Sequence, residues 1–138
     1  MRGRKPSTIL QLSGPSGAKA KRAPAWFGAA AKAEWARAYP ALLERRVITE
    51  ADLGTFEAYC LAVGQVRELA DEIAALTDRY VYSEAGTPRP HPAFRLQHEA
   101  MRQARQLAAE LGLTPVSRSR ASMTAKGDND DGWSDMDL

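Results

Sequence analysis

The sequence predicts a mainly α-helical chain that contains one short β-hairpin. Apolar residues recur at helical spacing along two long stretches, residues 49–76 and 92–111. Between them, residues 78–91 combine β-branched and aromatic side chains with turn chemistry, which is typical of a hairpin. Two helices joined by so short a connection pack antiparallel. We therefore expect short N-terminal helices followed by a long antiparallel helix pair joined by a short β-hairpin.

Residues 1–24 look like a flexible basic arm, because prolines and glycines interrupt any long element there. The first 22 residues contain no carboxylate and carry six cations, which are Arg2, Arg4, Lys5, Lys19, Lys21 and Arg22. A segment with charge of one sign cannot bury itself, and a nucleic-acid backbone is the strongest counter-charge available. We predict that these six residues contact DNA and supply affinity without base information. The alternative is a solvated tail that helps solubility.

A first helix is expected from about residue 28 to 39, where alanine and other strong helix formers dominate. Pro40 is expected to end or kink this helix, because proline has no N–H to donate and its ring crowds the preceding turn. Residues 41–46 then form a second short helical piece. The aromatic residues of this region are expected in the core or at a subunit interface rather than stacked on bases.

The first long helix is expected to begin at Thr49, whose side chain is a favourable N-cap. Glu50 and Asp52 then lie in the positively charged first turn, and Ile48 can pack against Leu53 as a hydrophobic staple. A helix that continues to about residue 76 is roughly 40 Å long. That length is large for a small domain, and it indicates a face that packs against another helix or another chain.

Prolines and glycines delimit the hairpin and the second long helix. Pro88 and Pro90 limit the return strand of the hairpin to an edge position, because proline cannot donate to a ladder. Pro92 suits the first position of the last helix. Gly112 is a natural residue just past the end of that helix, and Pro115 stops any continuation.

Residues 115–138 have the composition of a flexible tail that is acidic at its end. Its last part carries Trp133 and Met136 among aspartates, which is typical of a docking segment for a partner. Such a segment could also compete with DNA for the basic arm, or it could simply be a solubilising end. We therefore divide the chain into a basic arm (1–24), a helical oligomerisation domain (25–114) and a tail (115–138).

The sequence shows no catalytic constellation, so we expect neither enzyme activity nor a cofactor or metal. Cys60 is the only cysteine, so no intramolecular disulfide and no zinc site built from cysteines can form. His91 and His98 have too few neighbouring ligands for a metal site. Residues 14–19 superficially resemble a phosphate loop, but they lack its required spacing and follow no hydrophobic strand.

Membrane insertion and secretion are also disfavoured by the sequence. No apolar run approaches the ~20 residues needed to span a bilayer. The charged start is not followed by the apolar region of a secretory signal. We expect a soluble intracellular protein.

Local strings along the chain, taken in order from about Gly3 to Arg120, resemble the phage terminase small subunit, in the family whose members begin with a Gly-Arg-Lys-Pro arm. The matching strings are Gly3–Pro6, Ala31–Trp35, Leu42-Leu43, Val47–Asp52, Glu57–Cys60, His91-Pro92, Ala100-Met101, Leu107–Pro115 and Ser117–Arg120. Two features depart from the family. Residues 14–19 replace a Leu-rich stretch with Asn-Pro-Gly-Lys that members often carry, and the acidic tail has no counterpart.

The resemblance implies a phage-encoded DNA-packaging protein that works in the host cytoplasm. Such proteins form a ring-shaped homo-oligomer, bind double-stranded viral DNA and recruit a separate large terminase subunit that carries the ATPase and nuclease. The long helices of neighbouring protomers pack to build the ring. On this basis we expect an oligomer interface formed by apolar residues of the two long helices, namely Leu53, Phe56, Val63, Ile73, Leu96 and Leu107.

Three points stay open at this stage. Arg95, Arg102 and Arg105 of the last helix could line DNA or a ring channel, or could pair with carboxylates of a neighbouring protomer, which we favour. A helix-turn-helix transcription regulator is an alternative function, although Pro40 lies awkwardly for that fold. A small hydrolase or nuclease is a further alternative, and no ligand cluster in the sequence supports it.

Overall fold

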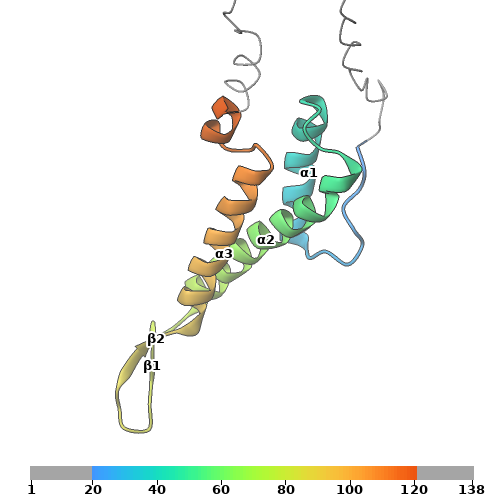
Figure 1. Ribbon diagram of the computed structural model, residues 1–138. Coiled ribbons are helices and arrows are strands. Elements are labelled where there is room, and N and C mark those ends of the chain that lie inside the picture. The colour runs from blue at the N-terminus through green and yellow to red at the C-terminus, as the bar shows by residue number, and fades with distance from the viewer. Residues whose placement is uncertain (1–19, 121–138) are drawn as a thin grey trace, which may run out of the picture.

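The computed structural model describes residues 20–120 of the 138-residue chain, whose main elements are three long helices and one two-stranded hairpin. The elements are α1 (Ala29–Glu44), a 3-10 turn (Glu50–Asp52), α2 (Leu53–Ala75), β1 (Tyr80–Tyr82), β2 (Pro88–Pro90) and α3 (Pro92–Glu110). α2 and α3 pack as an antiparallel pair, and α1 lies beside the N-terminal half of α2 (Figure 1). The hairpin projects beyond the far end of the pair. The predicted mainly helical fold with one hairpin is confirmed.

α1 runs through Pro40, so the helix does not end there and residues 41–44 continue it instead of forming a separate piece. The neighbouring side chains explain this difference. Tyr39 and Leu42 are buried in the core, and their burial offsets the backbone hydrogen bond that proline cannot make. The helix ends just before Arg46, which adopts the left-handed conformation with φ 54°. There the N–H of Val47 donates to the carbonyl of Leu42 at 3.1 Å, closing a Schellman arrangement.

The entrance to α2 lies where the sequence places it, and it begins with a single 3-10 turn. The Asp52 carboxylate accepts hydrogen bonds from the Thr49 N–H at 2.9 Å and from the Thr49 hydroxyl at 2.7 Å. These bonds hold the pKa of Asp52 below its usual value. Ile48 and Leu53, the predicted staple, both pack against the core.

The core lies where α1, the first half of α2 and the end of α3 meet. Its centre is an aromatic cluster in which Trp35 stacks on Tyr39 with ring centroids 5.2 Å apart and lies 4.7 Å from Phe56. Phe27, Tyr59, Cys60 and Leu111 close the same cluster. Aromatic pairs of this kind stabilise a core beyond their area burial. The core is therefore built within one protomer.

The hairpin is exposed along both strands, and Val81 pairs with Arg89 at its middle. Gly86 forms the turn with φ 75°, a conformation that favours glycine. Only His91 separates the hairpin from α3. Its ring Nδ1 accepts a hydrogen bond from the Ala93 N–H at 3.2 Å and so caps the helix. His91 is thus a structural cap.

The end of α3 forms the glycine-terminated arrangement that the sequence predicts. Gly112 has φ 68°. The N–H of Leu113 donates to the carbonyl of Ala108 at 2.8 Å, and the N–H of Gly112 donates to that of Ala109 at 3.2 Å. These two bonds are the Schellman pattern, which satisfies carbonyls that the helix leaves without partners.

Residues 115–120, which we assigned to the tail, are helical. Pro115 stops α3 from continuing but is well placed at the first position of a new helical segment, where no N–H is needed. Thr114 caps this segment, since its hydroxyl oxygen accepts from the Ser117 N–H at 3.2 Å. Residues 121–138, with the acidic end, lie outside the described part of the chain.

Candidate nucleic-acid and assembly surfaces

Two of the six predicted DNA-binding cations lie in the described part of the chain. Lys21 and Arg22 are both exposed, while Arg2, Arg4, Lys5 and Lys19 lie outside residues 20–120. The Lys21 ammonium forms an ion pair with the Glu50 carboxylate, with side chains 48% and 78% exposed. The hydrogen bond to Glu50 raises the pKa of Lys21.

The root of the arm is also held by the core. The indole N–H of Trp35 donates to the backbone carbonyl of Lys21 at 2.8 Å. This contact fixes the backbone at Lys21 against the core. The blue segment that precedes α1 begins at the end of the molecule opposite the hairpin, and the helical segment at residues 115–120 lies at the same end (Figure 1).

The structure places most of the predicted interface residues inside the protomer. Phe56 is fully buried, so its side chain offers no surface to a neighbouring chain. Leu53, Val63 and Leu107 are partly buried and pack against the same core. The reason is that α1 and the end of α3 cover the face of α2 that the sequence predicted to pack against another helix or another chain. Ile73 is half-buried and Leu96 is 38% exposed, so these two remain near the surface.

A buried carboxylate that the sequence analysis missed joins α1 to α2. Glu34 is 1% exposed. Its oxygens accept hydrogen bonds from the guanidinium groups of Arg37 and Arg67, the latter at 2.8 Å, and from the Tyr59 hydroxyl at 2.8 Å. Arg67 therefore pairs with Glu34 on another helix instead of with the carboxylates next to it in α2. Among the described residues no buried side-chain polar atom lacks a partner.

The network shifts the pKa values of its members. Burial by itself raises the pKa of Glu34, but the hydrogen bonds from Arg37 and Tyr59 and the charges of Arg37 and Arg67 outweigh it, and the pKa is lowered. Burial together with the Glu34 carboxylate raises the pKa of Tyr59 to about 12. Glu34 is thus ionised and Tyr59 protonated at neutral pH. The sequence contained a signal for this buried carboxylate. Glu34 lies at helical spacing among Ala31, Trp35 and Ala38, so it interrupts the apolar stripe of the helix.

α3 carries a basic stripe on the side that faces away from α2. Ala93 and Ala100, which are buried, mark the face that packs on α2. The opposite face carries four exposed residues, which we call the basic stripe: Arg95, His98, Arg102 and Arg105. In the described part of the chain none of the three arginines has an ion-pair partner.

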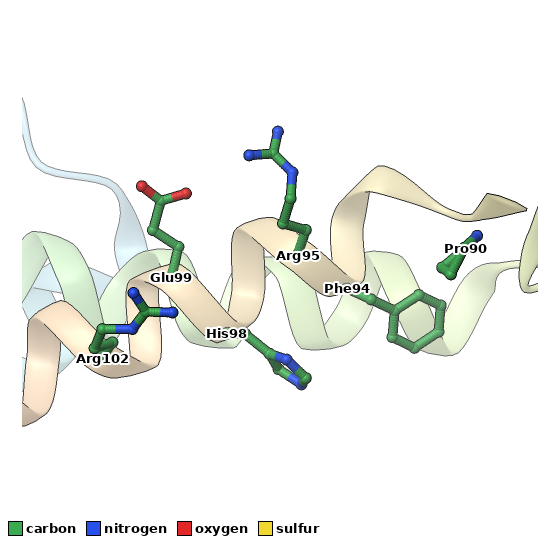
Figure 2. Close-up of a pocket in the computed structure, with 6 residues that line it drawn as sticks. All are labelled: Pro90, Phe94, Arg95, His98, Glu99 and Arg102. Atoms are coloured by element: carbon green, nitrogen blue, oxygen red, sulfur yellow. The ribbon is translucent and has the colours of Figure 1, made fainter.

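An open pocket of about 600 Å³ lies along this stripe, next to the hairpin. Figure 2 shows the Phe94 ring pointing toward Pro90 of β2, with the Arg95 and Glu99 side chains extending from another side of the helix. The pocket is lined by Pro90, Phe94, Arg95, His98, Glu99 and Arg102. Its cations and aromatic edge suit a carboxylate or phosphate partner rather than a buried small molecule.

α2 carries charge of the opposite sign on the face that neither α1 nor α3 covers. We call this face the acidic stripe, and it consists of Glu57, Leu61, Gln65, Glu68 and Glu72, spaced three, four or seven residues apart. A second depression, of about 300 Å³, lies along it and is lined by Gly28, Ala31, Leu61, Gly64, Gln65 and Glu68. Only Glu57 of the stripe is half-buried, and the rest are exposed.

The described residues offer little for catalysis or metal binding. Within residues 20–120 no group of three or more His, Cys, Asp or Glu side chains could hold a metal ion. Burial raises the pKa of the Cys60 thiol to about 12, so it is a poor nucleophile. In the same range no helix is long and apolar enough to cross a membrane.

Comparison with known proteins adds one finding. The sequence model of a protein family described as "phage terminase, small subunit" matches residues 31–128, more than two thirds of the chain. No curated protein and no solved structure gives a significant match. The matched range includes most of α1 and all of α2, the hairpin and α3, and it leaves out the basic arm.

Proposed function

The chain belongs to the family of phage terminase small subunits, and from this premise we propose that it binds double-stranded viral DNA, assembles into a ring and recruits the large terminase subunit. Family membership supports a role in phage DNA packaging and is the observation that carries the proposal. In this role the chain regulates and performs no catalysis itself, while the large subunit supplies the ATPase and nuclease.

The DNA contact is assigned to the basic arm. Six cations that each neutralise a phosphate release condensed counterions, which gives a slope of roughly −5 in log K against log salt. The ion pair between Lys21 and Glu50 does not oppose this, because both side chains are exposed and ion pairs between exposed side chains are weak and screened by salt. A single arm binds weakly. In a ring each further arm binds at high effective concentration, so the weak contacts multiply.

A helix-turn-helix regulator is not favoured. In that fold the second helix enters the major groove and its exposed face reads base edges. Here the exposed face of α2 carries Glu57, Glu68 and Glu72, which phosphates repel. The family match also points to packaging rather than to transcription.

Replacing all six arm cations by serine is expected to remove most salt-sensitive DNA binding. The reason is that the counterion-release contribution disappears with the charges, so the slope of about −5 should approach zero. The measurement is the dissociation constant for a viral DNA duplex at several salt concentrations, by fluorescence anisotropy. The set is Arg2, Arg4, Lys5, Lys19, Lys21 and Arg22.

A charge-preserving variant serves as the control. Exchanging arginine for lysine and lysine for arginine at the same six positions should leave the slope unchanged, because phosphate contacts depend mainly on charge. If the serine variant keeps the parent slope, the DNA surface lies on the folded part and the assignment to the arm is wrong.

A further inference from the structure

The acidic stripe of α2 and the basic stripe of α3 have no partners in the described part of the protomer. No ion pair joins the two stripes to each other or to other described residues. They also face different directions, since α3 packs on α2 through its alanine face and leaves the arginines on the opposite side. A second copy of the chain offers each stripe a surface of opposite charge.

The two stripes lie at matching levels along the helix pair. The Gln97 side-chain amide donates to the backbone carbonyl of Val66 at 3.5 Å, so these two residues lie side by side in the antiparallel pair. Because the helices are antiparallel, Glu68, two residues after Val66 in α2, lies level with Arg95, two residues before Gln97 in α3. The same count places Glu57 level with Arg105 to within about one residue, or roughly 1.5 Å.

The acidic stripe also has a shape that suits a long cationic side chain. The depression along it contains Gly28, Ala31 and Gly64, which have little or no side chain to fill it. Leu61 on its border can contact the aliphatic stem of an arginine. The Glu68 carboxylate on the same border can accept hydrogen bonds from the guanidinium.

We propose that the acidic stripe of one protomer docks on the basic stripe of the next, so that the arginines of α3 enter the depression between α1 and α2 of the neighbour. This assignment rests on the proposed ring and names the surfaces that build it. It places the oligomer interface on charged side chains of α2 and α3 instead of on the apolar residues predicted from the sequence.

Matching levels have a consequence for symmetry. Because two different surfaces meet, the contact is heterologous and generates either a closed ring or an open helical filament. Glu68 and Glu57 lie at the heights of Arg95 and Arg105 in the same protomer, so neighbours are related by rotation without a shift along the helices. Rotation without a shift closes a ring.

Charge reversal on either stripe tests the proposal in the full-length chain. The acidic-stripe variant carries Glu57→Lys and Glu72→Lys, and the basic-stripe variant carries Arg95→Glu and Arg105→Glu. Glu68 is left unchanged because its carboxylate lies close to Gly28 at the start of α1. Each variant alone is expected to assemble at least tenfold more weakly than the parent, as measured by native mass spectrometry, because like charges then face each other across every contact.

In an equimolar mixture of the two variants every contact between unlike chains again joins opposite charges, so mixed oligomers in which the two chains alternate are expected. A ring with an odd number of protomers keeps one contact between like chains. Two control variants each reverse two exposed charges elsewhere. One carries Glu44→Lys with Glu84→Lys, the other carries Lys32→Glu with Arg45→Glu, and both should keep the mass of the parent assembly. Far-ultraviolet circular dichroism verifies that every variant folds.

The outcomes separate this interface from the ring itself. If the parent chain is a monomer, the proposed ring fails and takes the interface with it. If the parent assembles and either folded variant keeps its mass, or the mixture forms no mixed oligomer, the chain still oligomerises but the two stripes are not its contact surfaces.

Discussion

Replacing Arg37 and Arg67 together by methionine is expected to lower the free energy of unfolding by about 3–5 kcal/mol. The Glu34 carboxylate is 1% exposed, so without the two guanidinium groups it is a buried charge with no counter-charge. The Tyr59 hydroxyl alone, at 2.8 Å, cannot replace them. Either single replacement should cost less, because one arginine still faces the carboxylate. Urea unfolding at a fixed protein concentration measures the difference.

Removing the buried carboxylate as well should recover much of the lost stability. In the triple variant with Glu34→Leu no buried charge is left unpaired, and a buried ion pair can be replaced by apolar residues at little cost. Replacing two exposed arginines elsewhere, Arg45→Met with Arg79→Met, is the control and should change the free energy of unfolding by less than about 0.5 kcal/mol. If the control and the Arg37 and Arg67 variant lose the same free energy of unfolding, Glu34 does not need the two guanidinium groups as its counter-charges.

The same network gives the acid dependence of stability a definite sign. The pKa of Glu34 in the folded chain lies below its ordinary value of 4.5. A depressed folded pKa contributes stability that is complete above the unfolded value and is lost as pH falls through the folded value. Asp52 adds a contribution of the same sign. The Glu34→Gln variant should therefore lose less stability than the parent between neutral pH and the acid region below 4.5.

The second large effect is expected at Gly64, where α1 and α2 are in close contact. A Cβ added at Gly64 would lie 2.9 Å from the backbone nitrogen of Ala31 and 3.0 Å from its Cβ. Neither atom can move without shifting α1. We expect Gly64→Ala to lower the free energy of unfolding by about 1–3 kcal/mol, although alanine is the better helix former.

Gly54 offers a matched control in the same helix. A Cβ added there meets nothing within 4 Å. Gly54→Ala should therefore raise the free energy of unfolding by about 0.5–1 kcal/mol, because alanine loses less backbone entropy on folding. Thermal or urea unfolding of both variants should show shifts of opposite sign. A gain at Gly64 would mean that the two helices are not in contact there.

Much of the fold follows from local signals in the sequence. The capping residue Thr49, the hairpin prolines and Gly112 each act through the conformation of their own neighbourhood, and the structure has helices and turns where they predict them. The effect of Pro40 on α1 could not be predicted locally. The helix continues through Pro40 because Tyr39 and Leu42 are buried, and their burial depends on packing against α2. The helix at residues 115–120 depended on Thr114 as a cap, a signal that the charged composition of the tail obscured.

The assembly surfaces could not be predicted in the same way. Apolar periodicity shows that a helix has a packing face, but it cannot say whether the partner is in the same chain. Phe56 and Leu107 were predicted at the oligomer interface, because the sequence does not reveal that both pack into the core of one protomer. The sequence shows the acidic residues of α2, but it does not show which of them lie on the face that α1 and α3 leave uncovered.

Solution mass tests most directly the claim that this chain acts as an assembly. Native mass spectrometry of the full chain across micromolar concentrations should show one closed oligomer of defined stoichiometry. A clean monomer over the whole range would contradict both the ring and the cooperative action of the arms on DNA.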